Sequence, residues 1–244
     1  MLLKNKKYII FLSALFIVAE IVLSVLIHKI HGEVNTIVSY AAVVFACLFA
    51  VLFAERTKVY FFTQAALVMT VLADYFLVIL PEIKQFPAMV FFSIAQIAYF
   101  ARIYVSTEKK RMRVFHCVLR LEVVVFAVIL TFIVLRHMID AVSVISMFYF
   151  ANLIVNIIFA FAQFKKNYLL AVGLLLFACC DVLIGFSFLG NYLEIAPGSF
   201  AYKLAHPGMN LAWVFYVPSQ TLLALSLMPD RLKKISSSCN GTEG

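Results

Sequence analysis

Runs of about twenty apolar residues recur along the whole sequence, separated by short polar turns. The hydrocarbon core of a bilayer is about 30 Å thick, and about 20 apolar residues cross it as a helix. Eight runs of roughly this length can be placed, at residues 8–27, 37–54, 60–80, 87–105, 114–135, 141–164, 168–190 and 209–227. The sequence therefore predicts an all-α integral membrane protein. We expect one domain over residues 1–244, a bundle of about eight transmembrane helices, with a short tail at 228–244.

The composition supports a membrane protein and argues against a soluble or nucleic-acid-binding one. Hydrophobic residues make up 65% of the chain and charged residues 13%, whereas a soluble domain averages about 45–50% apolar and about 25% charged residues. The net charge of +8 comes from basic residues at the ends of the apolar runs. They form no stripe with aromatic residues of the kind that binds a phosphate backbone.

The distribution of basic residues predicts the topology. Alternating the loops between two sides places 16 of the 20 Lys and Arg residues on the side of the N-terminus, leaving Lys29, Lys84, Arg136 and Lys203 on the other. Since positively charged loops stay in the cytoplasm, both termini are expected there. The chain length and short loops fit a bacterial inner-membrane protein.

Three carboxylates interrupt the apolar runs at similar depths. Asp74 and Asp181 lie roughly 21 and 20 Å above the inner ends of their spans, and Glu20 lies at roughly 18 Å. A carboxylate in the hydrocarbon core costs about 2.5–3.5 kcal/mol on insertion scales, so such residues usually serve a function. Asp74 and Asp181 have no basic residue at their depth. We therefore interpret them as an acid/base pair.

Other polar residues inside the spans are expected to face the same interior. Gln96, Asn156, Tyr216 and Gln220 form, with Glu20, a predicted pocket around the two aspartates, because lipid cannot satisfy their hydrogen bonds. Each of these side chains could instead serve only as hydrogen-bonding glue between helices. Glu20 and Glu122 could pair with cations. Arg120 is expected to extend its long side chain toward the inner interface.

No motif predicts a metal site or a cofactor. The five cysteines have no disulfide or zinc spacing, and the four that lie in apolar runs, Cys47, Cys117, Cys179 and Cys180, are interpreted as small buried hydrophobes. His28 and His31 share one helix face, and a zinc site at the interface stays a minor alternative. A glycine-rich phosphate loop and a G-x-S-x-G nucleophile motif are both absent from the sequence. Acid/base catalysis without a cofactor is what remains for an enzyme.

Four segments in order resemble the YhhN/lysoplasmalogenase family. They are LADYFL at 72–77, FFSIAQIAY at 91–99, GLLLFACCD at 173–181 and YVPSQTLLALS at 216–226. The resemblance covers roughly residues 50–228, and the chain resembles a divergent member of this family. It implies an eight-helix membrane hydrolase that cleaves the vinyl ether bond of lysoplasmalogens, or of a related ether or ester lipid, to a fatty aldehyde and a glycerophospho-headgroup.

The family's two aspartates match Asp74 and Asp181, the pair already selected by depth. Two positions depart from the family pattern: Ala73 replaces a glycine and Gln96 replaces a histidine. Glutamine can form hydrogen bonds but cannot carry a proton at neutral pH. The family's lysine before the third helix corresponds to Lys58, which is expected to serve topology or headgroup contact.

Two other classes of protein are also compatible with acids in the membrane. A proton-coupled small-molecule transporter would need them, although the sequence has no inverted repeat and no pair of broken helices. A non-catalytic lipid-binding protein could use them to hold helices together. In each case the partners expected are the membrane and, for the hydrolase, a lysophospholipid or ether lipid; nucleic acid is not expected.

Overall fold

The computed structural model describes residues 6–54, 57–80, 82, 84–189, 196–205 and 211–228. These residues fold into a bundle of helices, and no strand occurs among them. The elements are α1 (Lys6–Lys29), α2 (Glu33–Phe53), α3 (Lys58–Asp74), the π-helical turn η2 (Tyr75–Ile79), α4 (Gln85–Ser106), α5 (Lys110–Leu135), the 3-10 turn η3 (Arg136–Met138), α6 (Ala141–Ala162), α7 (Phe164–Leu189), α8 (Phe200–Ala205) and α9 (Leu211–Leu225).

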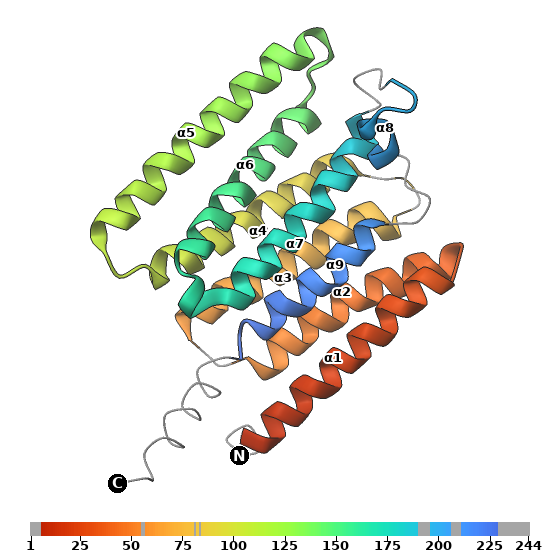
Figure 1. The fold of residues 1–244 in the computed structure, drawn as a ribbon, viewed down its shortest axis with the longest axis vertical. Coiled ribbons are helices and arrows are strands. Elements are labelled where there is room, and N and C mark those ends of the chain that lie inside the picture. The colour runs from red at the N-terminus through yellow and green to blue at the C-terminus, as the bar shows by residue number, and fades with distance from the viewer. Residues whose placement is uncertain are drawn as a thin grey trace.

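The predicted all-α membrane fold is confirmed. Within the described residues, seven helices are long and apolar enough to cross a membrane, and their bounds lie within a few residues of the first seven predicted spans. The eighth, α9, has 15 residues, which is roughly 22 Å of helix. α1 begins and α9 ends at the same end of the bundle (Figure 1). The side of the membrane on which this end lies stays a prediction, and the tail beyond residue 228 lies outside the described residues.

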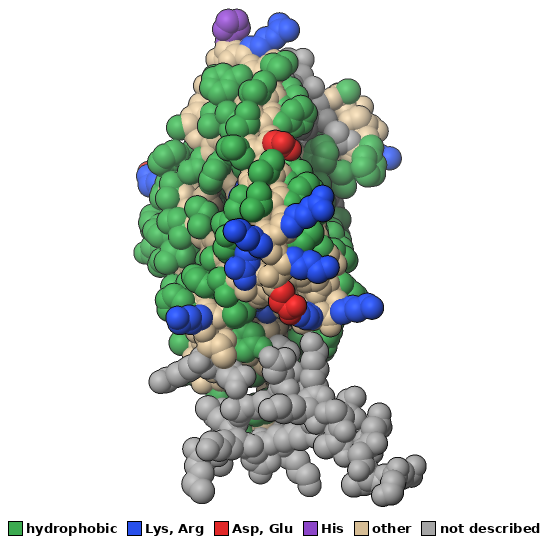
Figure 2. All heavy atoms as spheres, turned by 90° about the vertical axis from the view of Figure 1, so that its left-hand side faces the viewer, with side chains coloured by type: hydrophobic (Ala, Val, Ile, Leu, Met, Phe, Trp, Pro, Cys, Tyr) green, Lys and Arg blue, Asp and Glu red, His purple; other side chains and the backbone are tan. Residues whose placement is uncertain are grey.

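The helices form a broad bundle with α1 and α5 at its two edges (Figure 1). α3 packs mainly against α4, and α7 packs mainly against α9; α5 contacts α6, and α1 contacts α2 and α9. Figure 2 shows the side of the bundle that carries α5, where apolar side chains cover most of the surface and Lys and Arg gather toward the lower half. Such a surface is typical of one that faces lipid. The central helices are therefore the ones that can shelter polar groups.

The end of α3 has an unusual backbone. Thr57 caps the start of the helix by accepting a hydrogen bond from the backbone N–H of Tyr60 at 3.2 Å. At the other end, the regular helix stops at Asp74, and the next residues form the π turn, in which the N–H of Leu80 donates to the carbonyl of Tyr75 at 3.2 Å. Single π turns in membrane and soluble helices are often found at functional sites. Here the turn follows directly on the first candidate aspartate.

α7 and α9 approach each other closely at Gly173. A Cβ atom at Gly173 would lie 3.0 Å from Cγ and Cδ2 of Leu223 and 3.3 Å from its backbone nitrogen. The hydroxyl of Ser219 donates to the carbonyl of Gly173 at 2.8 Å across the same contact. Small residues permit this kind of backbone approach between membrane helices.

A larger residue at position 173 is expected to separate α7 from α9. Gly173→Leu should lower the free energy of unfolding by at least about 1–3 kcal/mol, the usual cost of overpacking, and the melting temperature in detergent by several degrees. Gly185→Leu, on the same helix, is the matched control, because nothing lies within 4 Å of a Cβ at that position. Equal melting temperatures for the two variants would contradict the proposed close packing.

Candidate functional site

Asp74 lies at the end of α3 and is held by a tyrosine from α9. The hydroxyl of Tyr216 donates to Oδ2 of Asp74 at 2.6 Å. Both residues are buried, Asp74 being 3% exposed. The other carboxyl oxygen of Asp74, Oδ1, accepts no hydrogen bond from the described residues, so it is the oxygen available to a bound molecule.

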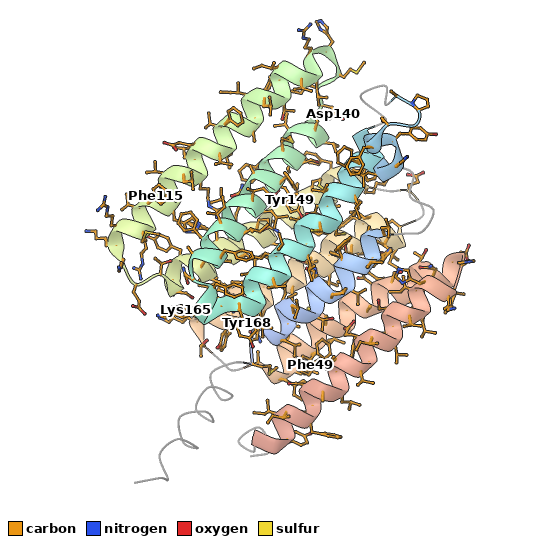
Figure 3. All side chains as sticks on the ribbon, in the orientation of Figure 1. Phe49, Phe115, Asp140, Tyr149, Lys165 and Tyr168 are labelled. Carbon is orange, nitrogen blue, oxygen red and sulfur yellow. The ribbon has the colours of Figure 1, made fainter. Side chains whose placement is uncertain are left out.

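Asp181 lies in the middle of α7 and has a matching partner on α6. The hydroxyl of Tyr149 donates to Oδ2 of Asp181, and Tyr149 lies between α6 and α7 (Figure 3). Four helices thus supply two carboxyl–tyrosine pairs to the interior, where Asp74 is buried and Asp181 is partly buried.

Aromatic rings connect the two pairs. Phe92 of α4 lies 5.5 Å from the ring of Tyr149 and 5.9 Å from that of Phe177 of α7, measured between centroids. The ring of Phe177 lies 5.4 Å from that of Tyr216. A wall of this kind excludes water and lowers the local dielectric constant, which strengthens every electrostatic interaction of the carboxyls.

Gln96 and Asn156, two of the predicted pocket residues, bond to each other. The side-chain amide of Asn156 donates to the backbone and side-chain oxygens of Gln96, both at 2.9 Å. The oxygen of Asn156 accepts from Arg120, and Arg120 also donates to Asn152. The expected extension of Arg120 toward the interface is therefore wrong. Its guanidinium turns into the bundle, lying 4.3 Å from the ring centroid of Phe100.

Glu20 and Gln220 are buried as expected but have no partner among the described residues. Both carboxyl oxygens of Glu20 and both amide atoms of Gln220 lack hydrogen bonds there. Gln220 lies one helical turn beyond Tyr216 and faces the interior. Glu20 lies on α1, at the edge of the bundle, and neither Glu20 nor Glu122 forms an ion pair with a described residue. That Glu20 lines the same pocket as the two aspartates stays a prediction.

Two further buried polar residues, Tyr149 and Arg102, were not among the predicted pocket residues. Tyr149 shares a helix face with Asn156, seven residues on, which was a signal that its hydroxyl points inward. Arg102 was counted only as a topology residue, yet it is 1% exposed. Its guanidinium donates to the hydroxyls of Thr63 at 2.7 Å and Ser226 at 2.6 Å, and so joins α4 to α3 and to the end of α9.

The described residues contain no group of three His, Cys, Asp or Glu side chains placed to hold a metal ion. The donors that do converge are two carboxyls and two phenols. This set suits proton transfer: a carboxylic acid can donate a proton, a carboxylate can accept one or stabilise a cation, and a phenol can orient either.

The fold and this site define a class: a polytopic helical membrane protein with two aspartate–tyrosine pairs inside the bundle. The family model described as the YhhN family matches residues 34–227. The chain therefore belongs to the YhhN family, as its four motifs indicated. α1, with Glu20, lies before the matched region. No curated protein and no solved structure shows significant similarity to the chain.

Proposed function

We propose that this membrane protein hydrolyses the vinyl ether bond of lysoplasmalogens, with Asp74 and Asp181 as the reacting carboxyls. The observation that carries the proposal is the pair itself: two carboxyls on different helices, each bonded to a tyrosine, with the two tyrosines linked through the rings of Phe92 and Phe177. Membership of the YhhN family supports the same reaction, because the motifs that define the resemblance contain both aspartates.

The reaction is the addition of water to R–CH=CH–O–R′, giving R–CH₂–CHO and HO–R′. A protonated carboxyl gives its proton to the carbon farther from the ether oxygen, and the carbon next to oxygen becomes an oxocarbenium ion. The second carboxyl, ionised, stabilises this cation and takes a proton from the water that attacks it. The hemiacetal then collapses to the aldehyde and the glycerol alcohol, and one carboxyl is again protonated. Repulsion between neighbouring carboxylates favours a single proton on the pair.

The departures from the family pattern are compatible with this mechanism. Gln96 is fully buried and bonds to Asn156, one part of a network that continues to Arg120. The protons in the proposed reaction move between Asp74, Asp181, substrate and water, so none passes through residue 96. Ala73 is fully buried beside Asp74, where its methyl group adds packing and no chemistry.

The choice of lipid tests the proposal. Purified protein in detergent should release fatty aldehyde from a 1-alkenyl lysophospholipid and should leave the 1-alkyl analogue intact, because a saturated ether cannot be protonated on carbon. The 1-acyl analogue should release fatty acid slowly or not at all, because ester hydrolysis passes through an oxyanion, which an ionised carboxyl does not stabilise. Failure of a folded sample to release any aldehyde would contradict the proposal and favour the transporter or the non-catalytic protein.

A further inference from the structure

A second feature of the bundle lies next to the Asp74–Tyr216 pair. It is a pocket of about 400 Å³, here called the α1–α2 pocket, lined by residues that include His31, Thr36, Ser39, Leu77, Val78 and Trp213. Its volume lies within the range of about 300–1,000 Å³ that small-molecule sites occupy. The turn between α1 and α2 and the start of α9 lie at the same end of the bundle (Figure 1).

The inner wall of the pocket lies next to the Asp74–Tyr216 pair. Leu77 and Val78 belong to the π turn that directly follows Asp74. The ring of Trp213 lies 5.5 Å from that of Tyr216, whose hydroxyl bonds to Asp74. Ser39, which is 1% exposed, lies six residues into α2, roughly 9 Å from its first residue. The inner part of the pocket and the candidate catalytic carboxyl are therefore separated by one layer of side chains.

The walls of the pocket suit a polar, phosphate-bearing group. They carry an imidazole, hydroxyls and an indole, and no carboxylate is among the lining residues. The first turn of α2 also contributes, through Gly32 and Asn35. Gly32 precedes this helix without any side chain to cap it. The N–H of Asn35 donates to the carbonyl of Gly32 at 3.0 Å, so the N–H groups of Glu33 and Val34 keep the partial positive charge that attracts anions. The side chain of Glu33 is exposed and is not among the lining residues.

Asn35 makes the pocket rigid. Its amide nitrogen donates to the carbonyls of Ile27 and Ile30 at 2.8 and 2.7 Å, which fixes the end of α1 against α2. Its oxygen accepts from the hydroxyl of Ser39 at 3.0 Å. A ligand in the pocket would consequently meet a preformed wall, which reduces the entropy lost on binding.

We propose that the α1–α2 pocket binds the glycerophospho-headgroup of the single-chain lipid. The three glycerol carbons lie between the phosphate and the ether oxygen, so a headgroup held here directs the ether bond down toward Asp74. The identity of the lipid rests on the proposed function, whereas the location of the headgroup rests on the pocket. His31 and the first turn of α2 face the phosphate, and Trp213 covers the glycerol.

Trp213 makes the proposal directly measurable, because it is the only tryptophan in the sequence. A 1-alkyl lysophosphoethanolamine, which has the headgroup but cannot be hydrolysed at the ether, should change the emission of Trp213 saturably. A 1-alkyl glycerol of equal chain length lacks the phosphate and should bind at least about tenfold more weakly. Equal binding of the two lipids, or no emission change with either, would overturn the proposal.

Two matched variants test whether the lipid binds in the α1–α2 pocket. Thr36→Phe fills the pocket and should raise the Kd of the 1-alkyl lysophosphoethanolamine at least about tenfold. Ile37→Phe is the control, since Ile37 is 61% exposed on the lipid side of α2 and should bind as the wild type does. An equal loss of lipid affinity in both variants, or no loss in either, would contradict the assignment. If Thr36→Phe does not fold, the comparison of the two lipids in the wild type tests the proposal instead.

Aldehyde release, measured separately, distinguishes the two proposals. Aldehyde release with no response of Trp213 would retain the hydrolase and reject the headgroup pocket. A saturable Trp213 response that requires the phosphate, without aldehyde release, would retain the pocket and reject the hydrolase.

Discussion

Replacing either aspartate of the pair by asparagine is expected to abolish aldehyde release. Asp74→Asn and Asp181→Asn keep the shape of the side chain and an oxygen that accepts the tyrosine hydrogen bond, but they remove a group that donates or accepts a proton. Loss of general acid–base catalysis costs about 10²–10⁴-fold in rate. The kcat of each variant should therefore be at least about 10²-fold lower than that of the wild type. The melting temperature of each variant should equal or exceed that of the wild type.

The control for this prediction is Asp140→Asn. Asp140 is exposed and caps α6 by accepting from the N–H of Ser143 at 2.7 Å, a role that asparagine fills about as well. This variant should keep wild-type activity. If Asp74→Asn and Asp181→Asn instead lose expression or melt much earlier, the acids hold helices together and the catalytic assignment is wrong.

Removing the tyrosine hydroxyls is expected to have the next largest effect. Tyr216→Phe and Tyr149→Phe each delete one hydrogen bond to a carboxyl and leave the aromatic wall in place. A hydrogen bond to a charged group contributes about 1.5–3 kcal/mol, so kcat should fall by about 10- to 100-fold. KM should change little, because the phenols orient the carboxyls and do not hold the lipid.

Tyr168→Phe provides the comparison for these variants. Tyr168 is 48% exposed and lies near the start of α7, far from Tyr149 (Figure 3). Its variant should match the wild type in kcat and KM. A similar fall in all three variants would indicate a general effect on the bundle, and no fall in Tyr216→Phe or Tyr149→Phe would show that the carboxyls need no orienting partner.

The helical architecture and the depth of the acids could be predicted because both depend on position along a helix. A continuous apolar run with a polar residue at a known offset gives the length of the helix and the level of that residue. Asp74 and Asp181 were placed at one level, and in the structure the tyrosines bonded to them are linked through the rings of Phe92 and Phe177. Tyr216 was placed in their pocket and bonds to Asp74.

Lateral position within the bundle could not be predicted. Glu20 has nearly the same depth as the two aspartates, but α1 lies at the edge of the bundle and contacts α2 and α9. Gln96 and Asn156 face each other, yet their network continues to Arg120 of α5. Which helix faces which depends on packing between distant segments, and helical periodicity in a single sequence carries no information on it.

Hydrolysis of a 1-alkenyl lysophospholipid in D₂O tests the central claim most directly. The claim predicts that the wild type releases aldehyde with one deuterium on the carbon next to the carbonyl, and that the Asp74→Asn/Asp181→Asn double variant, folded and pure, releases none. Aldehyde without deuterium, no aldehyde from the folded wild type, or release by the double variant at the wild-type rate would contradict it.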